Sequence, residues 1–255
     1  TAMSGAFFTD LFGSNTADID VRALLHGYNL MSWDHETGTY QINDSVVAGM
    51  AVSKDAQNNR VYTFDLYGDL KFSDGSAITA KDYAFSILLT ASPELAKLGG
   101  QSAAVGAILG MDAYQSGKSS VLRGVRLLSD TQMSITISKA YEPYFYEMAL
   151  FDYSPYPISV LAPGCKVVDT EKGVGIVNAS GTGTAIFTAD LLQKTILDAA
   201  TGYMSHPSVV SGPYTLTSYD AQSGTASFAI NPYYKGNEDG EKPTIETIVY
   251  RTVAN

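Results

Sequence analysis

The chain contains 255 residues, of which 45% are hydrophobic and 16% are charged, and its formal net charge is −10 at pH 7. This length and apolar content are enough for one large or two small domains with a real core, and the acidic charge argues against a nucleic-acid partner. No run reaches the roughly 18 apolar residues of a membrane helix, and the single cysteine, Cys165, excludes an internal disulfide and zinc sites built from several cysteines.

The N-terminal part mixes short helical and extended signals. Apolar side chains near helical spacing predict a short helix over residues 17–29, which Thr16 or Asp18 could cap. Residues 33–38 are typical of a turn between two short strands. A short apolar segment follows at residues 46–52.

Residues 61–88 give the clearest local prediction, which is a strand, a turn and a helix. Every second side chain from Tyr62 to Leu66 is apolar, and this period of two is typical of a half-buried strand. Gly75 lies in a polar turn and can adopt positive φ. Thr79 and Asp82 have the spacing of a capping box, after which a helical apolar stripe begins.

The middle of the chain is less regular. We expect helical structure around residues 103–109 and 112–115, followed by two strands over 121–128 and 132–138. A helix is predicted over residues 141–150, because Pro143 suits a first helical turn. Beyond it, residues 152–163 contain three prolines and are expected to be irregular, and residues 171–183 are expected to be a glycine-rich loop.

The C-terminal part contains one convincing helix and several strands. Residues 188–200 start with a threonine cap and carry a helical apolar pattern. Residues 214–218 and 226–230 pair as a hairpin around Ser223-Gly224, and residues 244–253 alternate again. Strands and helices are interleaved without a strict βαβ rhythm, which indicates mixed α/β or α+β architecture.

Several segments, in their order along the chain, carry a resemblance to a known family. They are L-L-H-G-Y-N-L at 24–30, the strand and F-S-D-G-S-A-I-T-A-K-D-Y-A-F-S within 61–86, S-I-T-I-S-K-A-Y-E-P-Y-F-Y at 134–146, S-G-P-Y at 211–214 and N-P-Y-Y at 231–234. Together they resemble the N-terminal lobe of the extracellular solute-binding proteins, family 5, that serve oligopeptide and dipeptide ABC importers. Tyr234 stands where tryptophan is usual in that family.

The resemblance implies a fold and a domain organisation. The fold would be a periplasmic-binding-protein-like lobe with a mixed β-sheet. Residues 1–38 plus 150–255 would form its core subdomain, and residues 39–149 an inserted smaller one. Because family members have two lobes, we expect this chain to be an isolated N-terminal lobe without the second, C-terminal lobe.

The resemblance also implies a function without catalysis or a cofactor. The protein would capture oligopeptides or similar small solutes between two lobes and deliver them to ABC permease subunits. It would be a monomer on the extracellular side of a bacterial membrane, as a surface lipoprotein or in the periplasm. Its only membrane attachment would be a lipid anchor that this sequence no longer carries.

The family binds an extended peptide through main-chain pairing, so the resemblance places ligand contacts at specific positions. By its spacing from residues 25–28, the backbone strand of this lobe falls on Gly13, Ser14 and Asn15, for which an ordinary N-terminal loop is the alternative. Tyrosines suit a ligand cleft because they bury area and also form hydrogen bonds. The expected aromatic contacts, each of which could instead belong to the core, are Trp33, Phe151, Tyr153 and Tyr156.

The residues that could carry chemistry form no recognisable catalytic or metal motif. His26, His35 and His206 lie in neither H-E-x-x-H nor a hydrolase context, and His26 is predicted to be structural. Asp18 and Asp20 are expected on the solvated surface, and calcium ligand spacing is incomplete. Two other functions stay open: a surface sensor or adhesin that reuses the fold, and, with less support, a hydrolase.

Overall fold

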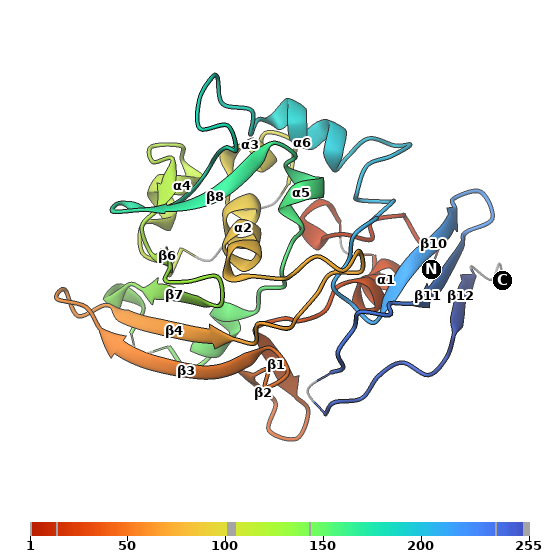
Figure 1. Ribbon diagram of the computed structural model, residues 1–255, viewed down its shortest axis with the longest axis horizontal. Helices are drawn as coiled ribbons and strands as arrows, with labels where there is room; N and C mark the ends of the chain where they lie inside the picture. Colours follow the sequence, from red (N-terminus) through yellow and green to blue (C-terminus); the bar gives the residue numbers. More distant parts are fainter. Residues whose placement is uncertain (1, 14, 101–105, 143, 238, 252–255) are drawn as a thin grey trace.

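The computed structural model describes residues 2–13, 15–100, 106–142, 144–237 and 239–251 (Figure 1). Its helices are η1 (Asp10–Phe12), α1 (Thr16–Leu25), α2 (Ala80–Thr90), α3 (Pro93–Ala96), α4 (Met111–Gln115), η2 (Lys139–Tyr141), η3 (Glu147–Phe151), α5 (Ile158–Leu161) and α6 (Ala189–Thr195), where η marks a 3₁₀ helix. Its strands are β1 (Met31–Asp34), β2 (Thr39–Ile42), β3 (Val47–Lys54), β4 (Arg60–Leu66), β5 (Val121–Leu122), β6 (Val125–Leu127), β7 (Gln132–Ile137), β8 (Cys165–Thr170), β9 (Gly173–Asn178), β10 (Tyr214–Asp220), β11 (Thr225–Ile230) and β12 (Thr247–Arg251).

The described strands form four small sheets, so the predicted mixed α/β architecture is confirmed. Their orders are β1-β2, β3-β4-β7-β6, β5-β9-β8 and β10-β11-β12. The expected combination of parallel and antiparallel pairing is not found, because every described pair is antiparallel. Short hairpins join β3 to β4, β8 to β9 and β10 to β11, and connections of this length allow only antiparallel neighbours.

The strand, turn and helix predicted over residues 61–88 are present as β4 and α2. Tyr62, Phe64 and Leu66 are buried on one face of β4, as their alternation predicts. At the start of α2, the Asp82 carboxylate accepts the Thr79 backbone N–H at 2.8 Å and the Thr79 hydroxyl at 2.9 Å. The side chain of Asp82 thus satisfies an amide at a helix end, where the helix itself offers no partner.

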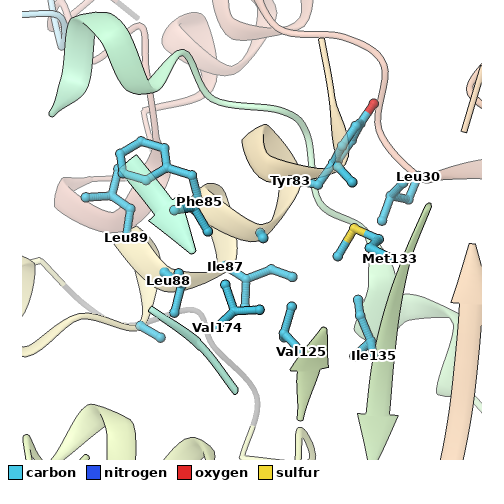
Figure 2. Close-up of a cluster of buried hydrophobic side chains, with 14 of the residues drawn as sticks. Leu30, Tyr83, Phe85, Ile87, Leu88, Leu89, Val125, Met133, Ile135 and Val174 are labelled. Carbon is cyan, nitrogen blue, oxygen red and sulfur yellow. The ribbon is translucent and has the colours of Figure 1, made fainter. Parts of the chain in front are cut away.

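Helix α2 lies at the centre of the larger hydrophobic core, between the β3-β4-β7-β6 sheet and the β5-β9-β8 sheet (Figures 1 and 2). Ile87 extends toward Val125 of β6 and Val174 of β9, and Met133 and Ile135 of β7 lie on the same side of the helix (Figure 2). All of these side chains are fully buried. Almost the whole circumference of the helix is buried, as expected for a helix with apolar residues on most faces.

Two tyrosines connect α2 to the loop after α1. The hydroxyl of Tyr83, which is fully buried, donates a hydrogen bond of 2.7 Å to the backbone carbonyl of Tyr28. Tyr28 has a φ of 58°, in the left-handed region that a residue with a side chain rarely adopts. Its own hydroxyl accepts the Lys235 backbone N–H at 2.6 Å, and its ring stacks on that of Tyr234. The strained backbone of Tyr28 is therefore fixed from two sides.

Helix α1 packs against β10 and belongs to a second, smaller hydrophobic cluster with Phe7 and Phe228. The predicted helix is present but shorter, and its N-cap is Asn15, whose side chain accepts the Ala17 N–H at 2.9 Å, and not Thr16 or Asp18. Asp18 is also not solvated. It is fully buried and accepts the Ser4 backbone N–H at 2.9 Å, so the N-terminal segment supplies the partner that a buried carboxylate needs.

Gly212 lies where the loop before β10 crosses the end of α1. Its N–H donates to the Leu25 carbonyl at 2.8 Å. A Cβ atom at this position would come within 2.5 Å of the Leu24 carbonyl oxygen, a contact that only glycine avoids.

Several predicted elements differ from the structure. The helix expected over residues 188–200 ends at Thr195, and residues 152–163, expected to be irregular, contain α5. Residues 171–183 are not all loop, because residues 173–178 form β9, which pairs with β8 along its whole length. The single helix expected over residues 141–150 is replaced by parts of η2 and η3, separated by an extended Glu142. The helix expected over residues 103–109 falls partly outside the described residues, and its described part is turn and bridge.

The division into residues 1–38 plus 150–255 and an inserted 39–149 stays a prediction. Strand β5 comes from the predicted insertion, whereas β8 and β9 of the same sheet come from the predicted core subdomain. None of the described helices has the length and apolar character needed to cross a bilayer.

Candidate ligand-binding site

A pocket of about 240 Å³ lies between helix α2 and the irregular segment that follows η3. Ser86 and Thr90 reach it from one face of α2, four residues apart and thus one above the other. Thr9 and Leu11 enter from the N-terminal segment. The opposite wall is made by Leu150, Asp152, Tyr153, Ser154 and Tyr156.

The two predicted tyrosines of this segment lie together in the pocket wall. The backbone carbonyl of Tyr153 accepts the Leu30 N–H at 3.0 Å, and the Tyr156 N–H donates to the Asp82 carbonyl at 3.3 Å. The Tyr156 ring also packs edge-to-face on Phe8, with 4.7 Å between ring centroids. Burial raises the pKa of the Tyr153 hydroxyl above its ordinary value, so this tyrosine stays protonated and able to donate a hydrogen bond.

Asp152 contributes the acidic group of this pocket. Its Oδ1 atom accepts a hydrogen bond of 2.7 Å from the side-chain amide of Asn29. The residue is exposed, yet partial desolvation of its carboxylate raises its pKa above the ordinary value. A carboxylate held by one donor beside tyrosines is suited to accept a cationic or N–H group.

Asn29 also lines a second pocket of about 300 Å³ on the other side of this hydrogen bond. Trp33, another predicted contact, lies in its wall with 45% of its surface exposed, and its ring packs edge-to-face on Tyr40. Tyr28 and Tyr234 form the stacked aromatic side of this pocket. The Asn29–Asp152 hydrogen bond therefore connects a lining residue of one pocket to a lining residue of the other.

The remaining predicted contacts lie elsewhere. Phe151 is fully buried in the core, where its ring packs on Tyr62 and Phe64, and it lines neither pocket. Gly13 follows η1 and has open space around it. Asn15 caps α1 and donates to the Ala2 carbonyl at 2.7 Å, while Ser14 lies outside the described residues.

The sequence interpretation missed Asp152, Asn29 and Thr9. Asp152 directly precedes Tyr153 in the irregular segment whose tyrosines are predicted ligand contacts, so its place in the sequence could have indicated a residue of the same pocket. Asn29 and Thr9 carried no such signal, because their contacts arise only when distant segments fold together.

The described residues contain no group of three or more metal-ligating side chains. His26 is structural, as predicted. Its Nε2 atom lies 2.9 Å from the Phe7 carbonyl oxygen, and desolvation by burial lowers its pKa to about 4.

Residues 45–255 match the protein family described as bacterial extracellular solute-binding proteins, family 5, middle region. The chain belongs to this family. Family 5 is a family of solute-binding proteins and is not enzymatic. The resemblance read from residues 24–30, 61–86, 134–146, 211–214 and 231–234 is confirmed.

Two named relatives are similar to this chain over different shares of its length. A periplasmic oligopeptide-binding protein OppA of Escherichia coli is 33% identical over 111 residues, which are 43% of this chain and 20% of that protein. An oligopeptide-binding protein OppA of Lactococcus lactis is 28% identical over 211 residues, which are 81% of this chain and 29% of that protein. The chain thus spans less than a third of the length of these curated relatives.

Solved structures of family 5 proteins have the same fold. The lactococcal OppA complexed with an endogenous peptide in the closed conformation aligns with a TM-score of 0.65 and 20% identity, over 99% of this chain and 40% of that one. The Listeria monocytogenes OppA bound to peptide aligns with a TM-score of 0.63 and 18% identity, over 99% of this chain and 41% of that one. The periplasmic-binding-protein-like fold is therefore present over nearly the whole chain.

Proposed function

We propose that this chain is the N-terminal lobe of a two-lobed binding protein that captures peptides or similar small solutes for an ABC importer. The observation that carries the proposal is the match to family 5 over residues 45–255, together with alignment of 99% of the chain to about 40% of peptide-bound relatives. A lobe of this size supplies one side of a ligand site, and closure on a second lobe supplies the other.

The pockets on either side of the Asn29–Asp152 pair support a role in ligand capture. Tyr153 and Tyr156 offer flat apolar surface with hydroxyl tips, which suits ligands of varied side chains. Trp33 offers a further half-exposed aromatic ring. Asp152 would accept the amino group of a ligand, and Asn29 would orient its carboxylate.

In this proposal, Gly13, Ser14 and Asn15 supply main-chain pairing for an extended ligand. Open space at Gly13 is compatible with close backbone approach, and the capping role of Asn15 would fix the register of this segment. Phe151 would act from the core by holding the start of the Tyr153 segment in place.

The same proposal assigns the division into a core subdomain and an inserted 39–149 subdomain, closure about a hinge near β12, and docking of the closed form on permease subunits. Its place would be the extracellular side of a bacterial membrane, with a lipid anchor or a periplasmic location. The family description and the periplasmic relatives support this location.

The test begins with isothermal titration calorimetry of a mixed pool of short peptides. The pool is titrated into this chain and, separately, into the two-lobed protein of which the chain is proposed to be one lobe. We expect weak or no binding to the 255-residue chain and measurable binding to the two-lobed protein, because half of the contacts and the closure step need both lobes. Native mass spectrometry of the two-lobed protein purified from cells would identify a bound ligand directly.

Variants then test the site itself in the two-lobed protein. We expect Asp152→Asn to weaken peptide binding about tenfold, as loss of one charge-assisted hydrogen bond predicts, and to have little effect on N-acetylated peptides. Asp44→Asn, an exposed carboxylate outside both pockets, is the matched control. Equal affinity of wild-type protein for free and acetylated peptides would contradict the role of Asp152, and the absence of any solute would contradict the proposed function.

A further inference from the structure

A third hollow, of about 760 Å³, lies away from both candidate ligand pockets, at one end of the β3-β4-β7-β6 sheet. Its walls come from the turn between β3 and β4, the β5–β6 connection, β7 and the start of η2. Three cationic side chains lie in these walls, Arg123, Arg126 and Lys139. This concentration of positive charge contrasts with the net charge of −10 for the whole chain.

One of the three cations is held by an ion pair, whereas the other two are not paired within the described residues. Arg126 donates through Nε to both carboxylate oxygens of Asp169, at 2.9 and 3.1 Å. Arg123 and Lys139 form no ion pair within the described part of the chain. Their charges are therefore available to a ligand in the hollow.

The one carboxylate in the wall, that of Asp55, is occupied by its own turn. Asp55 accepts the backbone N–H groups of Gln57 and Asn59, each at 2.9 Å, and the Asn59 side-chain amide at 2.8 Å. These hydrogen bonds, the Asn59 amide first, and the positive charge of Arg123 hold the pKa of Asp55 below its ordinary value. The turn thus satisfies most of the hydrogen-bonding capacity of Asp55, and its attraction to Arg123 acts through space without an ion pair among the described residues.

The backbone segments that carry Arg123 and Lys139 are fixed by hydrogen bonding and close packing. Buried Asn59 accepts the Lys139 backbone N–H through Oδ1 at 3.1 Å, which links the turn to the residue that carries the ammonium group. Arg123 precedes Gly124, where a Cβ would come within 2.7 Å of the Leu109 backbone, and Gly110 faces Arg123 with a φ of 86°. The β5–β6 connection therefore packs directly on the Leu109–Gly110 turn. Buried Thr136 adds a hydroxyl to the same wall.

We propose that this hollow binds a phosphate group, with Arg123 and Lys139 as its direct ligands and Thr136 as an additional donor. A guanidinium matches two phosphate oxygens at once, and a nearby ammonium neutralises the second charge of a dianion. The volume is large enough for a phosphate carried on a larger molecule. The same chemistry is presented by a soluble phosphate compound and by the headgroup of an anionic lipid.

The test measures binding to the 255-residue chain by NMR chemical-shift changes and calorimetry, with inorganic phosphate and pyrophosphate as soluble probes. Sedimentation with phosphatidylglycerol vesicles, compared with phosphatidylcholine vesicles, tests the lipid source. We expect saturable binding of at least one probe, with shifts centred on Arg123, Thr136 and Lys139. The double variant R123Q/K139Q should weaken it about tenfold or more.

Two controls separate a site from general charge. K118A/K172A removes two exposed lysines outside the hollow and should bind as the wild type does. R123K/K139R keeps both charges, tests folding independently, and should retain most vesicle binding but lose part of the pyrophosphate affinity. Binding of the soluble probes alone would identify the ligand as a small phosphate compound, and binding of the vesicles alone would identify it as a lipid headgroup. The proposal would be overturned if no probe bound, or if R123Q/K139Q and K118A/K172A lost the same amount of affinity.

Discussion

Helix α2 packs against the sheets on one face and lines a pocket on another. Comparing the two faces separates the residues that stabilise the fold from those that could bind a ligand. On one face Ile87 and Leu88 are fully buried and lie against the sheets. On another face Ser86 and Thr90 line the pocket together with Tyr153 and Tyr156. The first side is complete within this chain, whereas the second leaves a volume of about 240 Å³ unfilled.

The polar groups differ in the same way. The Tyr83 hydroxyl donates to a backbone carbonyl and is fully buried, so a ligand cannot reach it. Asp152 accepts a single side-chain donor in the structure and faces the pocket. A closed region with satisfied groups stabilises the fold, and an open region with available groups can bind another molecule. The following predictions test this contrast.

The largest effect is expected at Phe151, which lies on the closed side although the sequence suggested a ligand contact. Phe151→Ala should lower the free energy of unfolding by about 3–5 kcal/mol, because it leaves a cavity between Tyr62 and Phe64. Urea unfolding followed by circular dichroism measures this. A loss below about 1 kcal/mol would place Phe151 outside the rigid core.

A smaller loss is expected for Tyr83→Phe, which removes only the hydroxyl. The Tyr28 carbonyl would lose its buried donor, and we expect a cost of about 1–3 kcal/mol in unfolding free energy. Tyr141→Phe, at an exposed tyrosine, is the matched control and should change stability little. Indistinguishable midpoints for the two variants would mean that the Tyr83 hydrogen bond adds nothing.

Two buried groups should give opposing pH dependence. Desolvation by burial raises the pKa of Asp82 to about 6, above the value of about 4 in an unfolded chain. The folded state then binds more protons between these values, so this group lowers the unfolding free energy as pH rises from about 4 to 6. His26 has a folded pKa of about 4 against about 6.5 unfolded, so it raises the unfolding free energy with pH over the same range.

Single variants separate the two contributions. Relative to the wild type, Asp82→Asn should make stability increase more steeply between pH 4 and 6.5, and His26→Gln should make that increase shallower or reverse it. Denaturant midpoints at several pH values provide the measurement. Identical pH profiles for the three proteins would contradict both assignments.

The smallest effect on stability is expected at the open site. Trp33→Ala should change the unfolding free energy by less than about 1 kcal/mol, because the ring is 45% exposed. In the two-lobed protein the same variant should weaken ligand binding more than it weakens folding. The reverse ranking would move Trp33 from the binding site to the core.

Much of the closed region could be predicted from the sequence because it follows local rules. The alternation in β4 and the Thr79–Asp82 cap depend on residues close in sequence, and both are present. Strand β9 was not predicted because its two glycines suggest a loop, although pairing with β5 and β8 stabilises the strand. The helix expected at 141–150 failed for a similar reason, because long-range ion pairs from Arg60 to Glu142 and Glu147 fix that segment.

The candidate site was predictable only in part. Tyr153 and Tyr156, predicted as ligand contacts from their polar aromatic chemistry in an irregular segment, line the same pocket, and their role in binding stays a prediction. Asp18 was misjudged because a carboxylate is usually solvated, and the partner that allows its burial lies fourteen residues away. Contacts between distant segments, such as Asn29 with Asp152, have no local signature in a single sequence.

The S-G-P-Y motif that helped to identify the family owes its glycine to sterics. Gly212 lies so close to the carbonyl end of α1 that any side chain at this position would clash with it. A substitution there would force the helix and the β10-β11-β12 sheet apart before any solute was encountered. This glycine therefore determines how two parts of the polypeptide are joined, independently of any solute that the protein binds.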